Sequence, residues 1–225
     1  MTPAGPLYCE TGHPWLFMAE PVNTVTNAFI IIAAIFALRD IRRAKIGMPI
    51  DLAILLFLLF ATGIGSFFWH GFRTRIALAF DALPGLAFLF VFAGLWMRVL
   101  WGGLAGLLGA IALLVASILS LYLGRLYLGG LPSMPPAIFL VPAYATVAVV
   151  GIILATVTTH RYGRGPARLG AAALASALIA AMCRSIDLMT CSIIPFGTHF
   201  IWHILLSLAA YLGILMLLRL KPKPV

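Results

Sequence analysis

Residues 51–72 read DLAILLFLLFATGIGSFFWHGF, and this stretch decides the fold class of the chain. After the leading aspartate it stays apolar for most of its length, until a serine, a tryptophan and a histidine occur near its end. A helix of about 20 mostly apolar residues is what crosses the hydrocarbon core of a bilayer. The stretch therefore predicts a membrane-spanning helix whose polar groups gather at one surface.

The composition of the whole chain indicates the same solvent. Of 225 residues, 63% are hydrophobic and 9% are charged, whereas a soluble domain carries about 25% charged residues. A soluble core of this size could not hide so much apolar surface from water. In a bilayer every backbone polar group must be satisfied internally, and the long unbroken apolar runs favour helices over a closed barrel.

Six further segments have a similar length and apolar character. We therefore predict an all-α membrane protein in which residues 1–225 form a single domain, a seven-transmembrane helix bundle. The expected spans are residues 20–38, 51–72, 76–97, 103–123, 136–158, 168–189 and 198–218. The connections between them are short and carry glycine, proline and charge, so no segment is long enough for a separate soluble domain.

The basic residues between the spans predict the orientation of the bundle. With the N-terminus outside, the outer segments hold Arg73, Arg75 and Arg125, and Arg184 lies within the sixth span. The inner segments then hold the other eleven, which are Arg39, Arg42, Arg43, Lys45, Arg98, Arg161, Arg164, Arg168, Arg219, Lys221 and Lys223. Basic residues accumulate in cytoplasmic loops, so we expect the N-terminus outside and the C-terminus cytoplasmic. The net charge of +9 then reflects topology and anionic headgroups rather than nucleic acid.

The ionisable side chains inside the spans gather at one depth. His70 lies at the end of the second predicted span, Asp81 near the start of the third, and His199 and His203 at the start of the seventh. Because successive spans run in opposite directions, these positions share the outer layer of the bundle, and Ser66 lies one helical turn before His70. Polar groups inside a membrane are costly and typical of functional sites.

The spacing of the histidines indicates a metal site. His199 and His203 are four residues apart and face the same side of a helix, and His70 lies at matching depth. Three imidazoles around one cation, with a fourth position open, are typical of catalytic zinc. Zinc lowers the pKa of a bound water to about 7. Asp81 could act as general base or hold that water, and Ser66 could donate a hydrogen bond to the developing oxyanion.

Other interpretations of the same residues stay open at this level. A lone histidine inside a span is more often a hydrogen-bonded packing residue than a ligand. Asp81 could be a buried acid paired with Arg73 or Arg75. Small residues such as Ser66 and Gly65 are common where membrane helices touch, so neither indicates chemistry alone.

Three blocks of sequence resemble the alkaline ceramidases and, more broadly, the membrane hydrolase superfamily that includes the adiponectin and progestin receptors. The first is Glu20-Pro-Val-Asn23-Thr-Val-Thr-Asn27, similar to E-x-x-N-T-x-S-N. The second, Gly65-Ser66-Phe-Phe-Trp-His70 with Asp81-Ala-Leu-Pro84, is similar to G-S-x-x-x-H…D-E-x-P. The third, His199-Phe-Ile-Trp202-His203-Ile-Leu-Leu-Ser, is similar to H-x-x-W-H-x-L-x-S. The blocks lie in spans one, two, three and seven, so the resemblance extends over nearly the whole chain.

The resemblance implies a seven-helix hydrolase that holds zinc through His70, His199 and His203, with Asp81 and Ser66 as catalytic residues. The implied reaction hydrolyses the N-acyl bond of ceramide, or of a ceramide-like membrane lipid, to a fatty acid and a sphingoid base.

The resemblance also implies two features of the outer surface. The family holds calcium through an N-terminal D-W-C-E-x-N segment and a later glutamate. This chain has Leu7-Tyr8-Cys9-Glu10 and lacks the leading aspartate, so Glu10 and Glu20 remain as candidate calcium ligands. The family joins the cysteines that correspond to Cys9 and Cys191, and we expect that disulfide here.

Two other functions compete with hydrolysis. One is a non-catalytic receptor or sensor in which zinc only staples the helices together. The other is a transporter or proton channel, which would need polar residues through the full depth of the membrane, whereas the fourth and fifth predicted spans are nearly featureless. The expected partner is a membrane lipid. The small size and short loops favour a bacterial inner-membrane protein with its active site toward the non-cytoplasmic face.

Overall fold

The computed structural model describes residues 7–12, 18–129 and 138–221. Within these residues the regular structure is helical and no strand occurs. Seven helical stretches are long and apolar enough to cross a membrane, which confirms the all-helical, seven-span part of the prediction. They are Pro21–Arg43, Ile50–Phe72, Arg75–Trp101, Gly103–Tyr127, Ile138–Tyr162, Arg164–Met189 and His199–Leu220.

The helices follow the predicted spans and mostly run a few residues beyond them. The elements are α1 (Pro21–Thr26), α2 (Ala28–Arg43), α3 (Ile50–Phe72), α4 (Arg75–Trp101), α5 (Gly103–Tyr127), a 3₁₀ turn η1 (Ile138–Leu140), α6 (Val141–Tyr162), α7 (Arg164–Ile186), a 3₁₀ turn η2 (Asp187–Met189) and α8 (His199–Leu220). The start of the expected fifth span, residues 136 and 137, lies outside the described residues, as does Lys223 of the charge count.

The first span is divided in two at Asn27. The hydroxyls of Thr24 and Thr26 donate to backbone carbonyls one turn back, at 2.6 Å to Glu20 O and 2.8 Å to Val22 O. Such side-chain bonds compete with the helical ladder and bend helices. The short α1 therefore carries polar residues at the end of the bundle where the first predicted block lies, and α2 continues as an ordinary apolar helix.

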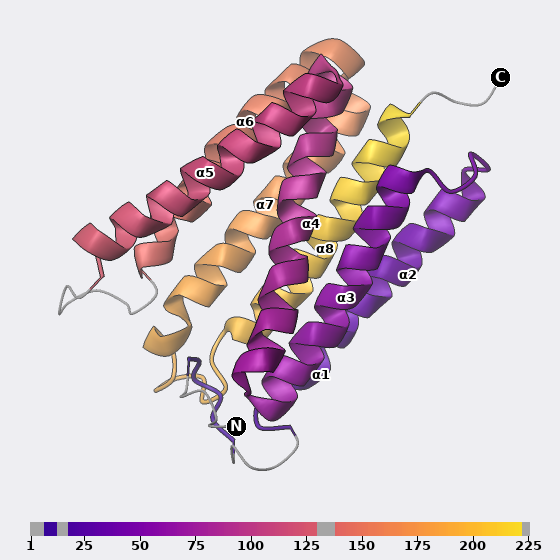
Figure 1. Cartoon of the computed structure of the whole chain (residues 1–225). Helices are drawn as coiled ribbons and strands as arrows, with labels where there is room; N and C mark the ends of the chain where they lie inside the picture. Colours follow the sequence, from indigo (N-terminus) through magenta and orange to yellow (C-terminus); the bar gives the residue numbers. More distant parts are fainter. Residues whose placement is uncertain (1–6, 13–17, 130–137, 222–225) are drawn as a thin grey trace.

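The bundle is closed by its first and last spans. The pairs α3 and α4, α4 and α5, α6 and α7, and α7 and α8 pack together, and α2 packs against α8. Its largest fully buried apolar side chains, which include Ile41, Leu52 and Ile214, come from α2, α3 and α8. Figure 1 shows α1, the end of α3 and the starts of α4 and α8 together at the lower end, while α8 ends at the opposite end. The chain thus brings four polar helix ends to one surface.

Gly65 sets the distance between α3 and α4. A Cβ atom at this position would lie 1.9 Å from the carbonyl oxygen of Phe80 and 2.9 Å from the backbone nitrogen of Asp81. Because both contacts are backbone, no side-chain rotation could make room for a methyl group. Only glycine lets the two helices approach this closely, so the packing role expected for Gly65 is confirmed.

We predict that Gly65→Ala lowers the free energy of unfolding by about 1–3 kcal/mol, the usual cost of an overpacked contact. Thermal unfolding in detergent measures the change. Gly103→Ala is the matched control, because a Cβ there meets nothing within 4 Å, and it should melt like the parent protein. Equal melting temperatures for the two variants would show that α3 and α4 do not meet at Gly65.

Candidate metal centre

Three buried histidines meet where α3 ends and α8 begins. His70 comes from the last turn of α3, and His199 and His203 come from the first turns of α8. Their side chains are 1–2% exposed, and one possible ligand nitrogen from each lies within 4.8 Å of the other two. The structure therefore joins the histidines that the sequence separates by more than half the chain.

Hydrogen bonds at the far side of two rings leave their other nitrogens available to a metal. Nδ1 of His70 lies 2.6 Å from Glu20 Oε2. Nδ1 of His203 lies 2.9 Å from the hydroxyl of Thr26, whose single hydrogen goes to a backbone carbonyl. The tautomer with its proton on Nδ1 satisfies both contacts and leaves the lone pair of Nε2 free, as in carboxylate–histidine–zinc arrangements.

The third ring completes a donor set that fits zinc. Nδ1 of His199 is buried and has no hydrogen-bond partner within the described parts of the chain. A buried ring nitrogen without a partner is costly, and coordination of a metal ion would remove that cost. Three neutral imidazoles at mutual distances below 5 Å match the ligand type and number of a catalytic zinc site.

The Thr26 hydroxyl offers a mild test of this arrangement. We predict that Thr26→Val weakens zinc binding about 10- to 100-fold, the usual effect of losing a hydrogen bond behind a metal ligand. Competition with a zinc-binding dye measures the affinity. Thr156→Val is the matched control, because its hydroxyl also bonds one turn back, to Ile152 O, but on the exposed face of α6. If the two variants bind zinc equally, Thr26 does not hold His203.

Glu20 links the histidine cluster to a buried arginine. Its Oε2 contacts His70 and the amide of Asn23 at 3.1 Å, and its Oε1 lies 3.0 Å from Nε of Arg73. Burial raises the pKa of the Glu20 carboxyl to about 7, while Arg73 and Asn23 act to lower it. The backbone before α1 is also bonded to the end of α3. The N–H of Ala19 donates to the carbonyl of Gly71, and the N–H of Glu20 donates to that of His70, both at 3.0 Å.

The N-terminal segment covers the histidines. The ring of Tyr8 stacks on His199 with centroids 3.7 Å apart and lies 5.4 Å from His70. The adjacent Cys9 forms a disulfide with Cys191, so the expected pairing is confirmed. The bridge holds the segment against the connection between α7 and α8.

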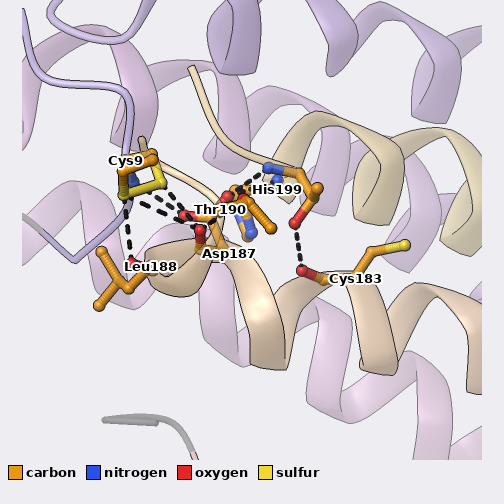
Figure 2. Close-up of a disulfide and its surroundings, with 8 residues drawn as sticks. Cys9, Cys183, Asp187, Leu188, Thr190 and His199 are labelled. Atoms are coloured by element: carbon orange, nitrogen blue, oxygen red, sulfur yellow. Dashed lines mark hydrogen bonds between the residues drawn. A yellow bond between two sulfur atoms is a disulfide. The ribbon is translucent and has the colours of Figure 1, made fainter. Parts of the chain in front are cut away.

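The carboxylate of Asp187 bonds both the N-terminal segment and the start of α8. Its Oδ1 accepts the backbone N–H groups of Thr198 and His199 at 2.6 and 2.8 Å, and its Oδ2 accepts that of Cys9 at 2.8 Å. Figure 2 shows Asp187 between the disulfide and His199. Gly197 must be glycine here, because its φ is +68° and a Cβ would lie 2.1 Å from Asp187 Oδ1. One carboxylate therefore fixes both the start of α8 and the covering segment.

Asp81 and Ser66 lie beside each other across the close contact at Gly65. The Ser66 hydroxyl interacts with the carboxylate of Asp81, and the guanidinium of Arg184 is the nearby positive charge. Ser66 lies one turn before His70 on α3, so the carboxylate adjoins the turn that carries a histidine of the cluster. Arg73, one of the partners considered for Asp81, instead forms an ion pair with Glu20.

Glu10, the other candidate calcium ligand, caps the first helix. Its two oxygens accept the backbone N–H groups of Val22 and Asn23 at 2.7 and 2.8 Å. Burial raises the pKa of its carboxyl, and these two hydrogen bonds act in the opposite direction. Glu10 and Glu20 thus both lie near Asn23, and each of their oxygens already accepts from an N–H donor.

Two residues that complete the centre, Tyr8 and Thr26, were not singled out from the sequence. Both contact the histidines, and only Thr26 lies inside one of the three quoted blocks. Arg73 was considered as a partner of Asp81 and contacts Glu20 instead. Asp187 carried a signal, since it is an acid at the outer end of a span. No pattern in the sequence indicates Tyr8, because its position depends on the disulfide formed by the next residue, Cys9.

Comparison with protein-family models finds a match to the family described as Ceramidase, over residues 7–223. A search of curated proteins finds no match. The matched region contains the three histidines, Glu20, Ser66 and Asp81, so the family assignment and the geometry concern the same part of the molecule. The resemblance inferred from the three sequence blocks is confirmed, and the chain belongs to the Ceramidase family.

Proposed function

We propose that the protein is a zinc-dependent intramembrane amidase, which hydrolyses the N-acyl bond of ceramide or a ceramide-like lipid to a fatty acid and a sphingoid base. Membership of the family supports a hydrolase with a ceramide substrate. The observation that carries the proposal is the cluster of three buried imidazoles beside the Asp81–Ser66 pair. This combination would hold a metal and offer a base at the same end of the bundle.

When bound by His70, His199 and His203, zinc would supply Lewis acidity that lowers the pKa of a coordinated water to about 7 and polarises the amide carbonyl. Asp81 would take a proton from the water as its oxygen forms a bond to the carbonyl carbon. The Ser66 hydroxyl would turn toward the carbonyl oxygen and donate a hydrogen bond as negative charge develops there.

Asp81 then serves a second time. When the C–N bond breaks, the leaving nitrogen keeps the bonding electrons and needs a proton, which the protonated Asp81 carboxyl would provide. The products are a carboxylic acid and an amine, so one water is consumed and no other co-reactant is required.

We further propose that the centre lies at the non-cytoplasmic side of a bacterial inner membrane. Two observations support this side. Eleven Lys and Arg fall in the opposite segments, and basic residues favour the cytoplasm. The Cys9–Cys191 disulfide lies at the same end as the histidines, and disulfides persist in oxidising compartments. A green fluorescent protein fused to the C-terminus should fluoresce, while an alkaline phosphatase fusion should be inactive; the reverse pattern would reject the orientation.

The function is tested by turnover of a lipid panel. Purified protein in detergent is given ceramides of several chain lengths and other N-acyl lipids, such as N-acyl amino-acid lipids. Mass spectrometry should find fatty acid and amine released in equal amounts. Removal of zinc with dipicolinate should stop release, and added zinc should restore it. A folded, zinc-loaded protein that cleaves none of these amides would contradict the proposal and favour the non-catalytic receptor.

A further inference from the structure

The two candidate calcium ligands of this chain, Glu10 and Glu20, are already engaged by N–H donors. Calcium takes six to eight oxygen ligands, mostly carboxylates and carbonyls. The two candidate carboxylates offer four oxygens, and each of these four already accepts a hydrogen bond. Glu10 bonds the amides of Val22 and Asn23, and Glu20 bonds Arg73, His70 and Asn23. A dication here would lie close to these N–H donors, which repel it, and would compete with them for the carboxylate lone pairs.

A cation is nevertheless present beside Glu20. The guanidinium of Arg73 lies 3.0 Å from Glu20 Oε1, and the Arg73 side chain is 4% exposed. It is also 4.1 Å from the ring centroid of Trp69 and 5.7 Å from that of Tyr8. These aromatic faces attract a positive charge. A carboxylate and two aromatic rings therefore surround the guanidinium, as in a binding site for a monovalent organic cation.

The backbone of Arg73 supports the same conclusion. The residue ends α3 with φ +54° and ψ +33°, in the left-handed region. Helix ends in this conformation usually carry glycine, because other side chains are strained there. A buried arginine at such a position indicates that the placement of its guanidinium outweighs the strain. In this conformation the side chain contacts Glu20, whose other oxygen lies 2.6 Å from Nδ1 of His70.

We propose that the guanidinium of Arg73 takes the place of calcium in this chain, as a built-in cation that positions Glu20 and, through it, the zinc ligand His70. The metal centre therefore forms without calcium. Arg73 is a positioning residue, since it acts on the site through Glu20. The inference concerns assembly of the centre and holds whatever lipid the enzyme cleaves.

Two buried amide oxygens require that calcium itself be used as a probe. The side-chain oxygens of Asn23 and Asn27 are buried and accept no hydrogen bond within the described residues, and amide oxygens are calcium ligands. The unmodified protein must therefore be titrated with calcium itself. Buffers are first stripped of divalent cations on a chelating resin, and equimolar cobalt then reports the histidine site through its visible spectrum.

The variants separate charge from bulk. Arg73→Lys keeps the positive charge, Arg73→Met removes it at similar length, and Arg75→Met is the matched control at an exposed position two residues on. We expect calcium up to about 10 mM, above the weakest protein sites, to change neither the cobalt spectrum nor the melting temperature of the parent. Arg73→Met should bind cobalt and zinc about 10- to 100-fold more weakly. Arg73→Lys should stay close to the parent, and Arg75→Met should match it.

Three results would overturn the proposal. A saturable calcium shift of the parent's melting temperature would show that a calcium site exists beside Arg73. Metal affinity of Arg73→Met equal to that of the parent would show that the cation does not position His70. Equal losses of metal affinity in Arg73→Lys and Arg73→Met would show that the shape of the side chain positions Glu20 and that its charge does not. If Arg73→Met does not fold, the proposal is still tested by the calcium titration of the parent and by the metal affinity of Arg73→Lys.

Discussion

His70→Ala is expected to reduce bound zinc from about one ion per protein to background and to abolish amide hydrolysis. Two imidazoles on α8 remain, but a catalytic zinc site needs three protein ligands. A bound metal supplies several kcal/mol of transition-state stabilisation, and each 1.36 kcal/mol corresponds to a factor of ten. The rate should therefore fall at least about 1000-fold. Metal analysis and fatty-acid release from ceramide measure the two effects.

His160→Ala is the control for this prediction. His160 lies near the end of α6, at the other end of the bundle, and is exposed. Its replacement should leave zinc content, turnover and melting temperature as they are. A His70→Ala protein that keeps its zinc and cleaves ceramide at the parent rate would show that the buried cluster is not the catalytic centre.

Asp81→Asn should separate catalysis from metal binding. The substitution preserves the size of the side chain and removes the proton acceptor, so we expect turnover to fall about 10²- to 10⁴-fold, the usual contribution of a general base. Zinc content should stay at one ion, because Asp81 lies outside the histidine cluster. Single-turnover release of fatty acid at saturating lipid isolates the chemical step.

Asp51→Asn is the matched carboxylate control. Asp51 lies in the first turn of α3, at the end opposite His70, and pairs with Lys221 at 2.8 Å. This variant should hydrolyse ceramide at nearly the parent rate. Should Asp81→Asn turn over like Asp51→Asn, the proton would have another acceptor. Should it lose zinc as well, Asp81 would belong to the metal site instead.

Much of the centre could be predicted because it depends on regular helices. Hydropathy determines where each span begins, and a helical turn relates His199 to His203 and Ser66 to His70. Matching depths of different spans then bring the histidines together without knowledge of their contacts. Sequence alone does not predict the contact between Ser66 and Asp81, because it needs the close approach at Gly65.

The rest could not be predicted because it depends on irregular chain. Before the structure, Arg73 was an alternative partner for Asp81, and charge alone could not distinguish these acids. The left-handed backbone of Arg73 directs its side chain to Glu20, and no spacing rule contains that turn. Tyr8 reaches His199 only because the N-terminal segment is fastened by Cys9 and Asp187.

The ligands of the proposed zinc site come from the second and the last of seven spans, and this separation has a consequence for biogenesis. During translation His70 enters the membrane long before His199 and His203 are synthesised. No truncated or partly inserted chain can hold the metal in this geometry, and the disulfide from Cys9 to Cys191 has no partner until the same moment. In the proposed enzyme, metal loading and oxidative closure would therefore belong to the last stage of maturation, and incomplete chains would be inert toward the lipids around them.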